Sequence, residues 1–239
     1  MTRTEKIWRN TVPIPRIASY PMPVGSQLAA GAAGWRPDPR RAALLIHDMQ
    51  RYFVGFFPPG RSPTIELVRN TVQARQAARS AGVPVIYTAQ PGRMSRAERG
   101  LLHDVWGPGM TDDPGDREII AELTPGPHDF VVTKSRYSAF FRTGLAALLA
   151  ELGRDQLIVC GVFAHIGCLC TAGDAFSRDI EAFLLADAVA DFSLRDHLTA
   201  LDHAARLCAV TMTTDQMREA LRPPALRVAA AARPAPPAR

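Results

Sequence analysis

The sequence predicts an α/β fold in which a six-stranded, mainly parallel sheet is covered by helices on both faces, forming three layers. Short, continuous apolar segments alternate along the chain with longer segments of helical periodicity. Strands that are apolar on both faces and separated by helices are typical of a buried parallel sheet. The chain has 239 residues, 47% of them hydrophobic, with no internal repeat and no linker-like segment between about residues 37 and 221. We therefore expect one large domain.

Six segments are predicted to be strands because each is a short apolar run bounded by turn residues or by a helical pattern. In chain order they are residues 42–47, 83–88, 130–134, 156–162, 181–187 and 208–213. The intervening helical patterns cover residues 62–80, 144–152 and 197–207, and a further helix is expected to begin near Ile166. Between the second and third strands, through Trp106 and Pro114, we expect a long loop.

The basic residues gather at the two ends of the chain. The formal net charge is +5, of which residues 1–16 carry +3 and residues 222–239 carry +4, leaving −2 for residues 17–221. A nucleic-acid partner is not expected, because such proteins mass basic residues on one face of the folded body. We expect residues 17–221 to form the domain. Residues 1–16 are predicted to be an N-terminal tail, and residues 222–239, rich in Pro, Ala and Arg, a disordered tail.

No segment has the length of a signal-peptide core or of a membrane span, so no membrane partner is expected. The four cysteines, at positions 160, 168, 170 and 208, do not have the spacing of a disulfide framework, and the chain is predicted to be cytoplasmic. His165, Cys168 and Cys170 are close in sequence, but zinc normally needs four ligands and no second cluster supplies the others. A metal site is therefore not expected.

Two charged residues are predicted to meet at one edge of the sheet. Lys134 is one of only two lysines among 28 basic residues, and it ends the third strand, whereas Asp48 directly follows the first. Ligands of open parallel sheets bind beyond the carboxyl ends of the strands, where the strand order reverses. An ammonium retained in an arginine-rich chain suggests a site that a guanidinium cannot serve. The pair is a candidate for acid–base chemistry; the alternatives are a structural ion pair and a solvated lysine.

Five motifs follow one another in order along the chain. They are Ile46–Gln50 (IHDMQ), Tyr87–Pro91 (YTAQP), Trp106–Gly109 (WGPG), Lys134–Phe140 (KSRYSAF) and Gly161–Gly167 (GVFAHIG). Together they resemble the isochorismatase-like hydrolases, and more narrowly the isochorismatases and the phenazine-pathway 2-amino-2-deoxyisochorismate hydrolases. The resemblance runs from about Pro13 to Met217 and implies the Rossmann-like three-layer fold of that family. It also implies that no cofactor or metal is needed and that the chain self-associates, at least into a dimer.

The position of the nucleophile separates two branches of this superfamily. Its cysteine hydrolases, such as nicotinamidases, use an Asp/Lys/Cys triad whose cysteine falls six residues after the glycine that ends the fourth strand. Here that glycine is Gly161, and the sixth residue after it is Gly167, which has no side chain. Cys168 is one residue later, a step that turns a helical side chain by about 100°, so we expect a buried, unreactive thiol. A cysteine amidase that uses Cys168 is the alternative within the same fold.

Glycine at this position implies, by resemblance, hydrolysis of a vinyl ether without a covalent intermediate. Asp48 would protonate the terminal methylene carbon of an enolpyruvyl group, and water would capture the resulting oxocarbenium ion. The products would be pyruvate and a trans-dihydro-dihydroxybenzoate or trans-dihydro-hydroxyanthranilate, in siderophore, phenazine or other secondary-metabolite and antibiotic biosynthesis. A neutral Asp48 would need a pKa raised by burial or by the carboxylates of the substrate. Lys134 would position the substrate and modulate Asp48.

The resemblance also assigns substrate contacts to Gln90, Arg99, Trp106, Phe163 and Gly167. Arg99 suits a carboxylate because a guanidinium binds it in a bidentate manner; the alternative is an exposed loop arginine. The backbone amides of residues 163–167, at the start of a helix, are expected to form an anion site.

Two positions depart from the family pattern. The chain has Phe163 where tyrosine is usual and Ser135 where tryptophan is usual. The first change removes a hydroxyl group from the pocket, and the second alters packing near Lys134. These departures leave an inactive binding subunit as a further alternative. The segment after the predicted domain is too short for an aryl carrier domain, so any carrier would be a separate protein.

Overall fold

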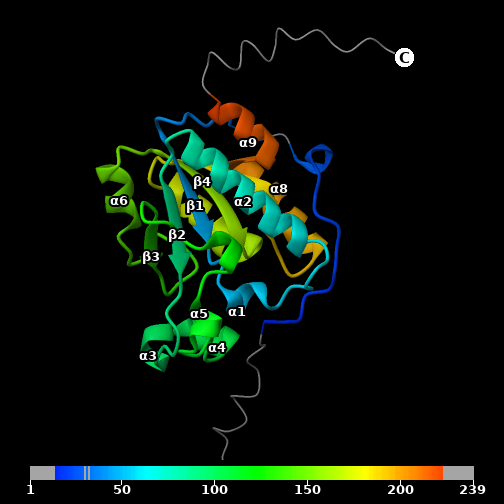
Figure 1. Cartoon of the computed structure of the whole chain (residues 1–239), viewed down its shortest axis with the longest axis vertical. Helices are drawn as coiled ribbons and strands as arrows, with labels where there is room; N and C mark the ends of the chain where they lie inside the picture. The colour runs from blue at the N-terminus through cyan, green and yellow to red at the C-terminus, as the bar shows by residue number, and fades with distance from the viewer. Residues whose placement is uncertain (1–13, 30, 32, 223–239) are drawn as a thin grey trace, which may run out of the picture.

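The computed structural model describes residues 14–222 except residues 30 and 32 (Figure 1). Residues 1–13 of the predicted N-terminal tail, and all of the predicted C-terminal tail except Arg222, lie outside the described residues. A six-stranded sheet forms the centre, with the strand order β3-β2-β1-β4-β5-β6, and every neighbouring pair is parallel. The strands are β1 (Ala42–His47), β2 (Val85–Ala89), β3 (Phe130–Thr133), β4 (Gln156–Val162), β5 (Glu181–Ala190) and β6 (Ala209–Met212).

All six predicted strands are present, and the sheet is wholly rather than mainly parallel. The largest difference is at β5, which continues to Ala190, three residues beyond the prediction. The reason is an irregularity in its pairing with β4. Val159 pairs with Leu184, whereas the next paired residue of β4, Gly161, pairs with Val189. The extra residues of β5 between these pairs let the strand resume pairing near the carboxyl end of β4.

Helices cover both faces of the sheet, as the sequence predicts (Figure 1). On one face lie α2 (Thr64–Ser80) and α9 (Thr214–Leu221), and on the other α6 (Leu145–Glu151), α7 (Leu169–Phe176) and α8 (Leu194–Leu207). The short helix α1 (Arg51–Val54) adds Phe53 to the first of these layers. Each layer has its own core. Leu67 of α2 and Met217 of α9 are buried in the first core, and Leu149 of α6 and Ala172 of α7 in the second. Burial of this apolar surface is the main stabilising contribution to such a fold.

Two predictions about the helices are corrected by the structure. The prediction ends with the sixth strand and misses α9, although Thr213 caps this helix by accepting a hydrogen bond from the amide of Gln216, whose side chain accepts one in return. The expected long loop contains three short helices, α3 (Arg96–Arg99), α4 (Leu101–Trp106) and α5 (Pro114–Arg117). These are shorter than the window over which helical periodicity can be recognised. Short 3-10 turns lie at Gly25–Gln27 and Ala121–Leu123.

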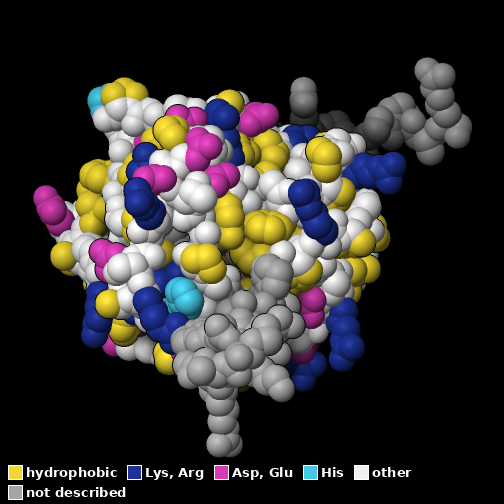
Figure 2. All heavy atoms as spheres, turned by 90° about the horizontal axis from the view of Figure 1, so that it is seen from below, with side chains coloured by type: hydrophobic (Ala, Val, Ile, Leu, Met, Phe, Trp, Pro, Cys, Tyr) yellow, Lys and Arg dark blue, Asp and Glu magenta, His cyan; other side chains and the backbone are white. Residues whose placement is uncertain are grey.

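Helices α1 and α3–α5 gather below the carboxyl ends of the strands (Figure 1). Figure 2 views the molecule from this side, and basic and acidic side chains alternate over the described part of the face with apolar ones between them. The ion pairs on and beside these helices join Arg51 to Glu118, Arg93 to Asp112 and Arg96 to Asp104. The described residues of this face therefore do not form the single-sign basic patch that nucleic acid requires. None of the described helices is long and apolar enough to cross a bilayer.

Candidate active site

Asp48 lies at the point where the strand order reverses. It directly follows β1, whose neighbours β2 and β4 lead to opposite edges of the sheet. Its backbone has a φ of 50°, in the left-handed region that aspartate adopts more readily than most residues. The Thr88 hydroxyl accepts a hydrogen bond from the Asp48 amide (3.0 Å) and donates one to Oδ1 (2.5 Å). The end of β2 thus fixes both the backbone and the carboxylate of Asp48.

Lys134 reaches Asp48 from the other side of β2. It follows β3, its amide donates to the carbonyl of Ala89, and its Nζ lies 2.8 Å from Asp48 Oδ2. Only 1% of the Lys134 side chain and 4% of the Asp48 side chain are exposed. Nζ also donates to the carbonyls of Arg136 (2.9 Å) and Tyr137 (3.5 Å). The predicted meeting of Asp48 and Lys134 is therefore confirmed, and the solvated-lysine alternative is excluded by burial.

The electrostatics of the protein groups around Asp48 favour its ionised form. Burial raises the pKa of Asp48, but the ammonium of Lys134 and the hydrogen bonds from Lys134 and Thr88 lower it by more, so the pKa lies below its usual value. His47, the preceding residue, is fully buried, and burial lowers its pKa to about 4. Its Nδ1 lies 2.9 Å from the carbonyl of Val162, which can only accept, so Nδ1 carries the proton of a neutral ring.

Gln90 is the third polar group at Asp48. It follows β2, and its Nε2 donates to Asp48 Oδ2 at 3.1 Å. The backbone of Gln90 is held at both ends by the buried side chain of Gln50, which accepts from its amide (2.8 Å) and donates to its carbonyl (2.9 Å). Gln50 also donates to the carbonyl of Arg117 (2.8 Å). Gln50, which belongs to the same short motif as Asp48, is therefore a positioning residue.

Arg99 is buried, with 6% of its surface exposed, and so is not an ordinary loop arginine. Its Nε donates to the carbonyl of Gly107 (2.5 Å), and its guanidinium packs so closely on Gly109 that a Cβ there would lie 2.5 Å from Cζ. Both glycines have positive φ values, 72° and 80°. Burial lowers the pKa of Arg99, and no carboxylate of the described residues lies within ion-pair distance of it. The Trp106–Gly109 motif therefore encloses an arginine whose charge is available to an anion.

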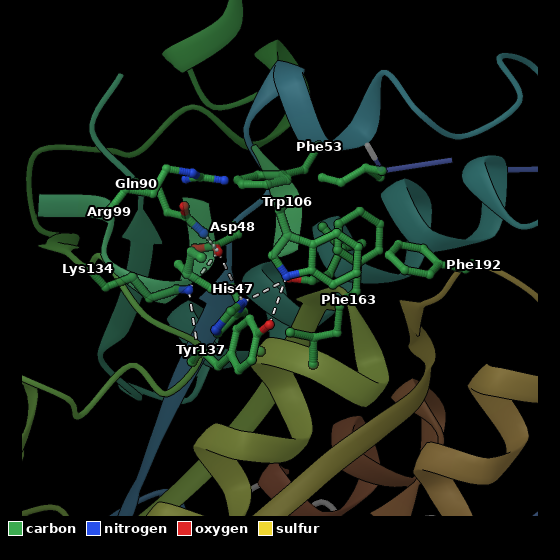
Figure 3. Close-up of a pocket in the computed structure, with 15 residues that line it drawn as sticks. His47, Asp48, Phe53, Gln90, Arg99, Trp106, Lys134, Tyr137, Phe163 and Phe192 are labelled. Atoms are coloured by element: carbon green, nitrogen blue, oxygen red, sulfur yellow. Dashed lines mark hydrogen bonds and ion pairs between the residues drawn. The ribbon is translucent and has the colours of Figure 1, made fainter. Parts of the chain in front are cut away.

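An aromatic wall faces these polar groups across the pocket (Figure 3). The Phe163 ring lies 4.7 Å from that of Phe192 and 6.0 Å from that of Phe53. Trp106 lies 5.9 Å from Phe192, and its Nε1 donates to the hydroxyl of Tyr137 (2.8 Å). The pocket thus has one charged wall and one apolar wall, and it suits a small anion with an apolar side.

Gly167 lines the pocket, and Cys168 does not. A π-helical turn (Ala164–Cys168) leads from β4 into α7 and turns Cys168 into the second core, where its surface is fully buried. Burial raises the pKa of the Cys168 thiol well above its usual value. The predicted burial of the Cys168 thiol is confirmed, and a nucleophile at Cys168 is not compatible with this geometry.

The expected anion site at residues 163–167 is only partly available. The amide of His165 donates to the carboxylate of Asp191 (2.6 Å), and the amides of Ile166 and Cys168 donate to the carbonyl of Phe163 (3.2 Å each). These three amides are therefore occupied within the protein. Among the described residues no three His, Cys, Asp or Glu side chains come together as a metal site would require.

All seven predicted site residues line one pocket, namely Asp48, Gln90, Arg99, Trp106, Lys134, Phe163 and Gly167. Ser135 does not line it, and Tyr137, two residues further along, does. The prediction also missed Phe192 and Ile14, which come from the end of β5 and from the predicted N-terminal tail. Neither has a sequence signal beyond apolar character. The prediction also missed His47, which lines the pocket, and Thr88, which holds Asp48. These two residues do have a sequence signal, because they lie inside motifs already recognised.

The comparison with known proteins agrees with this geometry. A model of the isochorismatase domain matches residues 42–216. The chain belongs to the isochorismatase family. It is 51% identical to the phenazine biosynthesis protein PhzD1 of Pseudomonas aeruginosa over 86% of this chain and 99% of that protein. It is 50% identical to an isochorismatase of Bacillus subtilis over 87% of this chain and 67% of that protein.

Solved structures extend the family to other chemistries. The chain is similar to a cysteine hydrolase from Pseudomonas syringae pv. phaseolicola with a TM-score of 0.71 and 27% identity, covering 78% of this chain and 95% of that one. An isochorismatase-family hydrolase and a cysteine hydrolase therefore share one fold, and the site must decide between them.

Proposed function

We propose that this hydrolase cleaves the enolpyruvyl ether of isochorismate or 2-amino-2-deoxyisochorismate. The observation that carries the proposal is the buried Asp48–Lys134 pair in a pocket where the nucleophile position is Gly167. Relatives named as an isochorismatase and as a phenazine biosynthesis protein support it. The products are pyruvate and the trans-dihydro-dihydroxybenzoate or trans-dihydro-hydroxyanthranilate, which feed siderophore, phenazine or other secondary-metabolite pathways.

The reaction needs an acid and a water molecule but no nucleophilic side chain. Asp48 gives its proton to the terminal methylene carbon, and the double bond becomes an oxocarbenium ion at the ether carbon. Water adds to that carbon and returns a proton to Asp48. The hemiketal then collapses into pyruvate and the ring alcohol. Lys134 holds the carboxylate of Asp48 in position between proton transfers.

Asp48 must acquire its proton when the substrate binds, because its pKa lies below the usual value in the empty site. Both of its oxygens accept hydrogen bonds there, and the contact from Gln90, at 3.1 Å, is the longest. The carboxylates of the substrate add negative charge to the pocket and raise the proton affinity of Asp48. We infer that proton uptake accompanies binding and that Gln90 is the contact that yields.

Other groups of the pocket divide the substrate between them. Arg99 binds a substrate carboxylate, since its guanidinium is buried and no carboxylate of the described residues pairs with it. The ring of the substrate packs on Trp106 and Phe163, and the absence of a hydroxyl on Phe163 leaves this wall wholly apolar around it. We further propose a cytoplasmic homo-oligomer. All four cysteines are free thiols, which supports a cytoplasmic location.

The test is pyruvate release, measured in a coupled assay from each of the two substrates. We expect the wild-type protein to release pyruvate from at least one, and Asp48→Asn to lower the turnover number by about 10²–10⁴-fold or more. The variant should remain folded because asparagine keeps the shape of the side chain. Near-normal turnover by folded Asp48→Asn would remove Asp48 from the mechanism. Absence of pyruvate from both substrates would favour the inactive-subunit alternative.

A further inference from the structure

The ring of His47 occupies the space that a side chain at position 167 would need. A Cβ added to Gly167 would lie 2.1 Å from Cε1 of His47, 2.8 Å from Nε2 and 3.0 Å from Nδ1. These are atoms of a rigid ring rather than the end of a flexible chain. Figure 3 shows His47 beside Asp48 and Tyr137, at the base of the polar wall.

The ring cannot move aside at low cost. It has no exposed surface, and Nδ1 lies 2.9 Å from the carbonyl of Val162, at the end of β4. Among the described residues its buried Nε2 has no hydrogen-bond partner of good geometry, although the backbone of Tyr137 lies close enough to raise the pKa of the ring. His47 lines the pocket, but its ring is neutral and the proposed reaction gives it no chemical step. A buried, polar ring beside the catalytic acid therefore needs another explanation, and its close approach to Gly167 suggests one.

We propose that His47 is a specificity-determining residue: it excludes every side chain, and so any nucleophile, from position 167. Position 167 lines the pocket together with Asp48 and Lys134. A thiol there would complete the set of groups that a cysteine hydrolase uses, as the resemblance to that class describes it. His47 and Gly167 together keep the site open to water alone. The steric part of this proposal stands on geometry, and its consequence for the reaction rests on the proposed function.

The first test measures whether the two positions are coupled. In Gly167→Ala the methyl group overlaps the His47 ring, so the melting temperature should fall by about 5–10 °C. Gly173→Ala, in α7, is the matched control, because nothing lies within 4 Å of its Cβ position; alanine should raise its melting temperature slightly, since glycine disfavours helix. In a His47→Ala background, Gly167→Ala should cost little or nothing. If the changes in melting temperature caused by His47→Ala and Gly167→Ala simply added, the proposed steric coupling of the two positions would be overturned.

The second test asks whether position 167 faces the chemistry once His47 is removed. All variants carry Cys170→Ser, because Cys170 is the exposed thiol of the described residues. The probe is p-nitrophenyl acetate: a thiolate attacks its carbonyl carbon, nitrophenolate leaves, and an acetyl thioester remains on the protein. We expect a stoichiometric adduct at position 167 in His47→Ala/Gly167→Cys, found by mass spectrometry. No adduct should form at that position in the Cys170→Ser parent.

Two results would contradict the proposal. One is a Gly167→Cys single variant that keeps the parent melting temperature and is acetylated with His47 in place. The other is a folded double variant that forms no adduct, which would mean that position 167 does not face the pocket. If the double variant does not fold, the melting temperatures of Gly167→Ala with and without His47→Ala still test the proposal. Failure of the proposed function is seen separately, as absence of pyruvate release by the wild-type protein, and leaves the coupling measurement unaffected.

Discussion

Lys134 contributes both a charge and a shape that fits its surroundings. Its ammonium makes one ion pair and two hydrogen bonds to carbonyls in a space that is closed to solvent. An ammonium can donate to three acceptors in such a small space, whereas a guanidinium presents its donors in a longer, planar fork. The retention of a lysine at this position, in a chain that otherwise uses arginine almost everywhere, fits this demand.

Lys134→Arg should therefore fail as a substitution although it preserves charge. We expect the turnover number for pyruvate release to fall by at least about 10²-fold, because the longer side chain displaces Asp48 from its position. Arg51→Lys, an exchange in an exposed ion pair, is the control and should leave turnover unchanged. An active arginine variant would show that Lys134 is peripheral to the reaction.

The state of Asp48 predicts the direction of the pH dependence. In the free enzyme its pKa lies below the usual value, so the fraction that carries a proton falls as the pH rises. We expect kcat/KM to decrease by about tenfold per pH unit between pH 6 and 8, and the residual activity of Asp48→Asn to lack this slope. A flat profile in the wild-type protein would indicate that Asp48 does not donate the proton.

At the level of the elements, the end of β5 and the start of the π-helical turn are joined by one ion pair. Asp191, which directly follows β5, is fully buried and accepts from the amide of His165 and from its Nδ1, each at 2.6 Å. Burial lowers the pKa of His165, but the hydrogen bond to Asp191 and its charge raise it by more, so the pKa lies above its usual value. A raised histidine pKa means that the charged form stabilises the fold.

The stability from this pair is full below the pKa of histidine in the unfolded chain and is lost as the pH rises through the higher folded pKa. We therefore expect His165→Gln to lower the melting temperature more at pH 6 than at pH 9. Thermal unfolding of both proteins across this range measures the difference. An equal effect at both pH values would mean that packing against Phe192, and not charge, is what His165 contributes.

The strands could be predicted from sequence because their burial on both faces leaves an unbroken apolar run. The boundaries of 42–47 and 156–162 agree with β1 and β4, the two central strands. Away from the two central strands, pairing decides the boundaries. The extension of β5 depends on an irregular register with β4, which has no signature in the segment itself.

Some site residues could also be predicted from the sequence, and others could not. Asp48, Lys134 and Gly167 follow strands, so topology alone brings them to one edge of the sheet. Phe192 and Tyr137 also line the pocket, but their positions depend on the path of the chain after β5 and after β3. The occupation of the His165 amide by Asp191 depends on a contact across 26 residues. Such contacts follow from packing and cannot be read from local pattern.

At the scale of the whole molecule, the segment of residues 14–20 packs against the chain that follows the carboxyl end of β5. Tyr20 is buried, and its hydroxyl accepts from the amide of Asp191 (2.8 Å) and donates to the carbonyl of the same residue (3.1 Å). The ring lies edge-on to His197 of α8. Ile17 is buried in the first core, and Ile14 lines the pocket. The segment thus connects the pocket to both faces of the sheet.

Tyr20→Phe removes this hydroxyl and leaves the amide of Asp191 buried without a partner. We expect the free energy of unfolding to fall by about 1–3 kcal/mol. Urea denaturation should show a lower midpoint with an unchanged slope, because the surface exposed on unfolding is the same. Ser19→Ala, which loses an exposed hydrogen bond to the carbonyl of Ser62, is the neighbouring control and should cost less. Equal midpoints for the wild-type protein and Tyr20→Phe would show that the network is not stabilising.

The glycines around Arg99 also affect how fast and how tightly an anion can bind. A mobile arginine loses about 0.5–1.5 kcal/mol of conformational entropy when a ligand immobilises it. Gly107 and Gly109 already fix this guanidinium in the empty pocket, with its Nε bound to a carbonyl and its water largely removed. Association then involves no search for the right rotamer, and the ligand meets a charge that is already oriented. Ordering this side chain is a cost of folding and not of binding.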